Sequence, residues 1–143
     1  MSNPTNRSTP QPTNAIKNIE VGKFYLIHDG SKTGHPGLVI WKDDNQNLYL
    51  IIKFGTSSNK DNASFPYPIG PDIKQSFYFK RPFLGKRKDI GNKPFADLVV
   101  NSVDISNILN GMDITNPMCS SNVTERNLHS YLYFIKKSPP IGL

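Results

Sequence analysis

The sequence has a single cysteine, Cys119, and lacks any apolar run of the about eighteen residues that a membrane span requires. One cysteine excludes an intramolecular disulfide and a cysteine-rich metal site. The N-terminus also lacks the apolar segment of a cleaved export signal. We therefore expect a soluble, cytoplasmic protein with no membrane partner.

The signatures of several enzyme classes are missing as well. There is no Gly-rich phosphate loop, no dinucleotide-binding fingerprint and no nucleophile elbow of a serine hydrolase. The three histidines, His28, His35 and His129, are too scattered for a recognisable metal-ligand spacing. The sequence accordingly predicts no metal site and no cofactor.

Positive charge, in contrast, is plentiful. The 143 residues carry a net charge of +6, which favours a polyanionic partner such as RNA. Residues 74–93 hold seven basic side chains and one acidic side chain, so their surplus of six equals the net charge of the whole chain. The charge is therefore concentrated in one segment.

This basic segment also contains aromatic residues. Phe83 lies among the cations, and residues 77–79 precede them with three further rings. Cations interleaved with rings suit phosphate contacts and base stacking on single-stranded RNA. We predict an RNA-binding loop at 80–88, with a solvated loop that binds nothing as the plainer alternative. Its cations are Lys80, Arg81, Lys86, Arg87 and Lys88.

The chain divides into a tail and one domain. Its first residues are rich in Pro, Ser, Thr and Asn and nearly devoid of apolar side chains, so they cannot offset the entropy of being ordered. We expect residues 1–18 to form a disordered tail. Residues 19–143 have the size and composition of a single domain.

Within this domain, short apolar and aromatic runs predict strands at 23–27, 38–41, 48–54, 76–80 and 95–100. The Asp- and Asn-rich residues 43–47 predict a hairpin turn. A helical turn is expected at 106–109. A C-terminal helix should begin at Asn122 with Glu125 in capping-box spacing. The fold class expected is β-rich α+β.

Metal-free cleavage of RNA needs a base for the 2′-hydroxyl, an acid for the leaving oxygen, and cations or donors around the phosphate. His35 lies in a predicted loop, and an imidazole exchanges protons near neutral pH. Thr56, Ser57 and Lys60 follow the strongest predicted strand and are typical of a phosphate cradle. The alternatives are a histidine without a role and an ordinary polar turn.

Two segments in this order, His35-Pro36-Gly37-Leu38-Val39-Ile40 and a strand ending in Thr56-Ser57, resemble the MazF/PemK-like toxin superfamily. The resemblance implies a small SH3-like β-barrel with a C-terminal helix. It also implies a metal-independent endoribonuclease, the toxin of a toxin–antitoxin system, which cleaves by 2′-hydroxyl attack and leaves a 2′,3′-cyclic phosphate. Residues 56–60 are similar to the ToxN-like branch, so the antitoxin could be an RNA or a small protein.

The resemblance also implies roles. Thr56 and Ser57 would orient or stabilise the scissile phosphate, Lys60 would be the nearest cation, and Lys53 a reserve cation that binds RNA. His35 stands where the family commonly has arginine, which cannot act as a base, so the assignment of base and acid stays open. Self-association through sheet surfaces is compatible with the family.

Two other functions fit the same residues. One is a barrel that binds RNA or DNA without cleaving it, in which the Thr56-Ser57 turn is structural. The other is a protein-interaction barrel that uses the aromatic residues 77–79 and the proline-rich tail.

Overall fold

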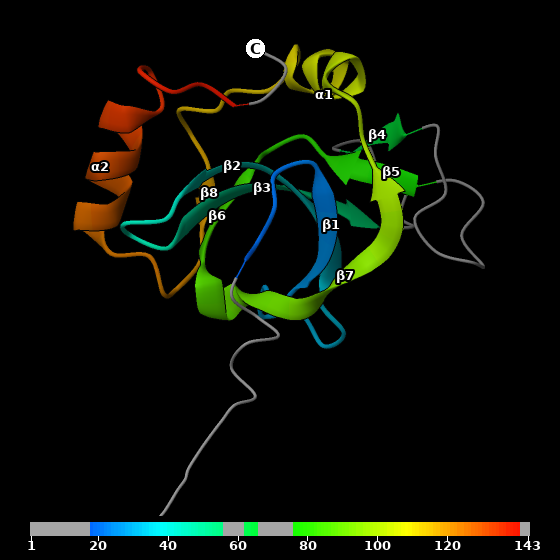
Figure 1. Ribbon diagram of the computed structural model, residues 1–143, viewed down its shortest axis with the longest axis horizontal. Coiled ribbons are helices and arrows are strands. Elements are labelled where there is room, and N and C mark those ends of the chain that lie inside the picture. Colours follow the sequence, from blue (N-terminus) through cyan, green and yellow to red (C-terminus); the bar gives the residue numbers. More distant parts are fainter. Residues whose placement is uncertain (1–17, 56–61, 66–75, 141–143) are drawn as a thin grey trace, which may run out of the picture.

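The computed structural model describes residues 18–55, 62–65 and 76–140. The described part of the chain forms eight strands, two α-helices and a short 3₁₀ helix, arranged as Figure 1 shows. In chain order the elements are β1 (Lys23–Ile27), β2 (His35–Asp43), β3 (Leu48–Gly55), β4 (Asn62–Phe65), β5 (Ser76–Phe79), β6 (Phe83–Lys86), η2 (Arg87–Asp89), β7 (Ile90–Val99), α1 (Ser102–Leu109), β8 (Met118–Cys119) and α2 (Glu125–Phe134).

The strands belong to one sheet in the order β4-β5-β3-β2-β1-β7, and β6 pairs with both β3 and β8. β3 is shared between two neighbours on one edge, because its first half pairs with β6 and its end pairs with β5. All pairings are antiparallel except that of β6 with β8. The predicted β-rich α+β class is confirmed.

The sheet is strongly curved in Figure 1, with α1 above it and α2 at its left. Among the described strands, no ladder joins β7 to β6 or to β8, so the sheet is not closed into a barrel. The SH3-like barrel therefore stays a prediction.

Apolar side chains pack on both faces of the sheet. Alternate residues of β3 belong to two separate clusters, because successive side chains of a strand point to opposite faces. The larger cluster includes both helices. There the Tyr131 ring of α2 lies edge-on to Trp41, with 5.2 Å between ring centroids, and the Trp41 indole donates to the Ser138 carbonyl. A charged side chain on β3 therefore has little access to water.

Several predicted elements are confirmed, namely β1, the hairpin of β2 and β3, and β5. The second strand is longer than predicted. It begins at His35, so the prediction that His35 lies in a loop is wrong. The reason is its pairing, because His35 lies opposite Ile27 at the end of β1.

The predicted basic loop at 80–88 is also wrong. Phe83 and Leu84 are buried in β6, which pairs with the first half of β3, and η2 follows directly. Two apolar residues among cations are a weak strand signal, and the pairing with β3 outweighs it. The following strand, β7, begins at Ile90 and not at Phe95.

Both helices begin at other residues than predicted. Helix α1 covers residues 102–109, and Asn101 caps it by accepting a hydrogen bond from the Asp104 amide. In α2 the cap is Thr124, which forms a capping box with Asn127, whereas Asn122 and Glu125 were predicted for these positions. The predicted capping box therefore exists, but it lies two residues further along the chain.

Gly37 allows the close approach of β1, β2 and β3. A Cβ atom at this position would lie nearer than 3.0 Å to the side chains of Ile27 and Ile51, both of which are fully buried. We expect Gly37→Ala to destabilise the protein by about 1–3 kcal/mol, measured by chemical denaturation, because the core would be overpacked. Gly111→Ala is the matched control, since no atom lies within 4 Å of its Cβ position. Equal stability of the two variants would contradict this account.

Candidate active site

The centre of the candidate site is Asp29, which lies two residues beyond the end of β1. The β1–β2 connection returns the chain so that His35 pairs with Ile27, and the next residues bring Gly37 opposite Lys53 on β3. Three neighbouring strands thus place Asp29, His35 and Lys53 together.

These side chains form one hydrogen-bonded group around the Asp29 carboxylate. Its Oδ2 atom lies 2.7 Å from His35 Nδ1 and 2.9 Å from Lys53 Nζ. Its Oδ1 atom accepts from the Ser31 hydroxyl at 2.6 Å and from the Ser31 amide at 3.2 Å. We refer to Asp29, Ser31, His35 and Lys53 as the Asp29 cluster.

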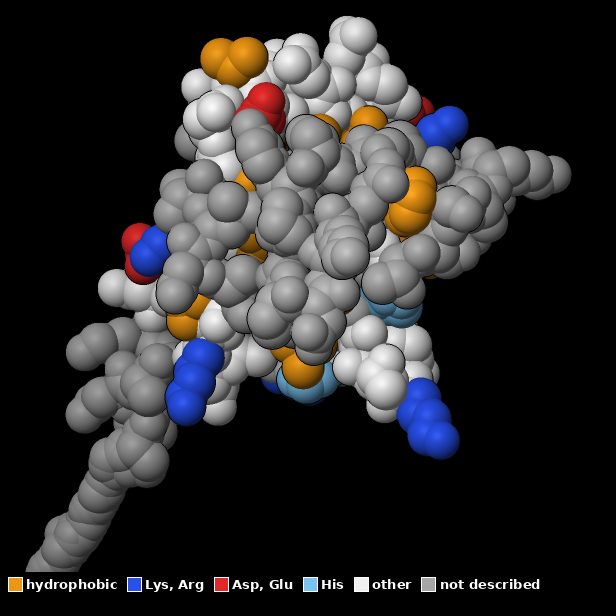
Figure 2. All heavy atoms as spheres, turned by 90° about the vertical axis from the view of Figure 1, so that its right-hand side faces the viewer, with side chains coloured by type: hydrophobic (Ala, Val, Ile, Leu, Met, Phe, Trp, Pro, Cys, Tyr) orange, Lys and Arg blue, Asp and Glu red, His pale blue; other side chains and the backbone are white. Residues whose placement is uncertain are grey.

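The cluster is buried on one side and open on the other. The side chains of Asp29 and Lys53 are 3% and 5% exposed, whereas that of His35 is 29% exposed. Figure 2, which views the right-hand side of Figure 1, shows histidine side chains at the surface on this side of the molecule. Of the three ionisable side chains of the cluster, the imidazole is therefore the one that solvent reaches.

The protonation of Asp29 sets the direction of the hydrogen bond to His35. Burial by itself would raise the pKa of Asp29, but hydrogen bonds from Ser31, Lys53 and His35 and the charge of Lys53 hold that pKa well below its ordinary value of 3.8. At neutral pH the carboxylate is ionised and only accepts hydrogen bonds. The imidazole therefore donates from Nδ1.

A neutral imidazole that carries its proton on Nδ1 has a lone pair on Nε2. No described residue forms a hydrogen bond with this atom. A Cβ atom built on Gly55, the last residue of β3, would lie 4.0 Å from His35 Nε2, and the Phe79 ring packs edge-on against the imidazole. Nε2 is thus held beside the end of β3.

Lys53 is held differently from a surface cation. Its ammonium group donates to Asp29 and lies 4.9 Å from the centre of the Phe79 ring and 5.0 Å from that of Phe83. Ion pairing and the two rings compensate a buried charge that would otherwise be costly. The structure therefore places Lys53, which was predicted to bind RNA, in the buried part of the Asp29 cluster, where it fixes the position of the carboxylate.

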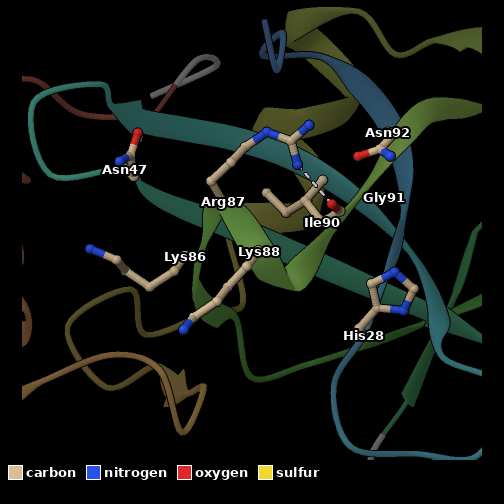
Figure 3. A pocket seen from close by; sticks show the side chains of 8 residues that line it. All are labelled: His28, Asn47, Lys86, Arg87, Lys88, Ile90, Gly91 and Asn92. Carbon is tan, nitrogen blue, oxygen red and sulfur yellow. Dashed lines mark hydrogen bonds between the residues drawn. The ribbon is translucent and has the colours of Figure 1, made fainter. Parts of the chain in front are cut away.

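The cations of β6 and η2 line a separate pocket of about 670 Å³, which we call the basic pocket. Figure 3 shows that Lys86, Arg87 and Lys88 spread in different directions around it. Lys86 Nζ donates to the Gln46 carbonyl, and Arg87 donates to the Ile90 carbonyl at 2.7 Å. The remaining lining residues are His28, Asn47, Ile90, Gly91 and Asn92.

The other predicted site residues are not part of these groups. Lys80 and Arg81 lie exposed in the turn between β5 and β6, where Arg81 donates to the Asn116 carbonyl at 2.9 Å. Thr56, Ser57 and Lys60 lie outside the described residues, so their predicted roles stay predictions. Of the four predicted catalytic residues, the structure describes His35.

Sequence reasoning did not identify Asp29 or Ser31 as site residues. A signal for Asp29 does exist in the sequence. Lys53 interrupts the apolar run of β3, and a lysine in a strand that is buried on both faces requires a buried anion. Asp29, two residues beyond the predicted strand 23–27, is one acid that could meet this requirement.

Comparisons with family models, with curated proteins and with solved structures find no match to this chain. Within residues 18–55, 62–65 and 76–140, no group of three or more His, Cys, Asp and Glu residues could hold a metal ion. No helix in the described part is long and apolar enough to cross a membrane.

Proposed function

We propose that this protein is a metal-independent endoribonuclease in which His35 Nε2 accepts the proton of the attacking 2′-hydroxyl. The observation that carries the proposal is the Asp29–His35 hydrogen bond of 2.7 Å, which fixes the tautomer that leaves a lone pair on Nε2. The attack forms a bond from the 2′-oxygen to phosphorus and breaks the bond from phosphorus to the 5′-oxygen, which takes up a proton from solvent. The products carry a 2′,3′-cyclic phosphate and a 5′-hydroxyl.

The rest of the Asp29 cluster supports this proton transfer. Asp29 orients the imidazole and stabilises the imidazolium that forms, as the acid of a catalytic triad does. The Lys53–Asp29 ion pair is neutral overall, so protonation of His35 adds one positive charge beside the phosphate as the phosphate gains negative charge.

The family resemblance adds three residues to the proposed site, namely Thr56, Ser57 and Lys60. Thr56 is bonded to Gly55, whose Cβ position lies 4.0 Å from His35 Nε2. In this proposal the two hydroxyls hold the scissile phosphate and Lys60 balances its charge. The cations of the basic pocket, together with Lys80 and Arg81, bind the RNA backbone.

The same resemblance gives the proposal a cellular role. The protein would be the toxin of a toxin–antitoxin system, inhibited by an RNA or by a small protein, and its open sheet would correspond to an SH3-like barrel. Expression without the antitoxin should then arrest growth. A second copy of the chain is a further candidate partner.

The proposal is tested by incubating purified protein with mixed RNA in EDTA and mapping the ends of any fragments. We expect 2′,3′-cyclic phosphate ends, because the 2′-hydroxyl is the nucleophile. Fragments with 2′- or 3′-hydroxyl ends would contradict the mechanism.

The basic pocket favours one other function, a module that binds RNA or DNA without cleaving it. The same experiment separates the two. Binding that weakens with salt, without cleavage products, would select the module over the nuclease.

A further inference from the structure

A second pocket lies behind the Asp29 cluster. Its volume is about 310 Å³, and Asp29 and Lys53 contribute to its wall. We call it the inner pocket. Its other lining residues are His28, Gly30, Phe83, Asp89, Met118, Cys119, Ser120 and Ser121. His35 does not line this pocket, but its hydrogen-bond partner Asp29 does.

The burial of the lining residues shows where the pocket opens. Asp89 is 4% exposed and Phe83 is equally buried, so both belong to its floor. Met118 is 38% exposed, and Ser121 is exposed as well, so β8 and the following turn form the rim. A ligand can therefore enter past β8 and reach the buried carboxylates.

The floor offers acceptors of hydrogen bonds. Asp89 Oδ1 accepts from the side-chain Nδ2 of Asn122 at 2.7 Å, and Asp89 Oδ2 accepts from the Lys86 backbone amide at 2.8 Å. A carboxylate has about four acceptor positions, so this group retains capacity for further donors. Because Lys53 is already paired with Asp29, the pocket carries more negative than positive charge, which disfavours an anionic ligand.

The pocket also offers apolar contact. Phe83 of the floor and Met118 of the rim both line it. Nucleobases that leave the stack are bound in this way, with their faces against aromatic or apolar side chains and their edges on hydrogen-bonding groups. A carboxylate accepts from an exocyclic amino group, as it does from cytosine N4.

We propose that the inner pocket binds a nucleobase that carries an exocyclic amino group. The base belongs to the nucleotide next to the cleaved phosphate, and this last point rests on the proposed function. Uracil, whose edge presents two carbonyl oxygens, is disfavoured by the acidic floor. His28 lines both the inner pocket and the basic pocket, so a strand whose backbone lies in the basic pocket continues directly to the base site.

The test uses nucleosides, which lack phosphate and so do not engage the basic pocket through charge. We expect cytidine and guanosine to shift the backbone amide NMR signals of residues 118–121. Uridine lacks the amino group of cytidine, and inosine lacks that of guanosine. Each should bind at least about tenfold more weakly than its counterpart, because an acceptor on the floor loses its donor. Equal binding within each pair would overturn the assignment, as would the absence of shifts at these residues.

A pocket-filling variant with a matched control locates the binding. Ser121→Trp should abolish the shifts, whereas Ser121→Ala should retain them, and the exposed position of Ser121 makes both compatible with folding. Retained binding in a folded Ser121→Trp protein would also overturn the assignment.

Two separate measurements on the unchanged protein distinguish this inference from the proposed function. Selective nucleoside binding without any RNA cleavage would refute the nuclease and leave the base pocket standing. RNA cleavage without nucleoside-induced shifts at residues 118–121 would refute the base pocket and leave the nuclease standing.

Discussion

His35→Ala is expected to lower the rate of RNA cleavage by about 10²–10⁴-fold, the usual contribution of a positioned general base. The reason is geometric, because Nε2 is the nitrogen of the cluster that is left without a hydrogen bond among the described residues while Nδ1 is held by Asp29 at 2.7 Å. The measurement is the initial rate on a defined RNA, under single-turnover conditions.

His35→Arg distinguishes a base from a group that only stabilises charge. Arginine keeps a positive charge at this position but stays protonated and cannot accept a proton. If His35 is the base, this variant is as inactive as His35→Ala. Activity near that of the unchanged protein would assign His35 to charge stabilisation, and the base would have to be sought elsewhere.

Both variants need a control for folding and binding. His35 is partly exposed, so its loss should change stability by less than the loss of a core residue. His129, on the surface of α2 and far along the chain from the cluster, offers a matched control, and His129→Ala should cleave at the normal rate.

The sequence predicted the strands that position His35 but not the partner that fixes it. Local apolar runs and an Asp- and Asn-rich turn suffice for β1, β2 and β3, since each signal lies within a few residues. The Asp29–Lys53 contact joins residues 24 apart, and no local pattern encodes it. A buried lysine indicates that an anionic side chain lies near it, but it does not identify that side chain.

The mistaken loop at 80–88 has a similar origin. Charge density in this segment suggested exposure, yet Phe83 and Leu84 are buried because β6 completes the edge of β3. The cations remain accessible around the basic pocket, because side chains on a strand and a 3₁₀ helix point in several directions. Residues 83–88 can therefore form a paired strand of the sheet and still present positive charge at the surface.

Asp29→Asn is expected to lower stability by about 3–5 kcal/mol, because it leaves the buried ammonium of Lys53 without its counter-charge. It should also lower cleavage by about 10²–10⁴-fold, since an amide does not hold the Nδ1-protonated tautomer of His35 as a carboxylate does. Chemical denaturation and single-turnover rates measure the two effects.

The double variant Asp29→Asn/Lys53→Met separates these effects. Removal of both charges avoids the uncompensated ammonium, so most of the lost stability should return, while cleavage stays low because the carboxylate is still absent. A double variant that regains activity along with stability would show that Asp29 acts only on the fold.

The pH dependence of stability gives an independent check on the carboxylate. The pKa of Asp29 in the folded protein lies well below its ordinary value of 3.8, so its stabilising contribution is fully present above that pH and is lost as the pH falls below it. The difference in unfolding free energy between the unchanged protein and Asp29→Asn should therefore shrink in acid. A difference that stays constant from neutral pH into that range would mean that the carboxylate is not held ionised by Lys53, Ser31 and His35, and the fixed tautomer of His35 would lose its basis.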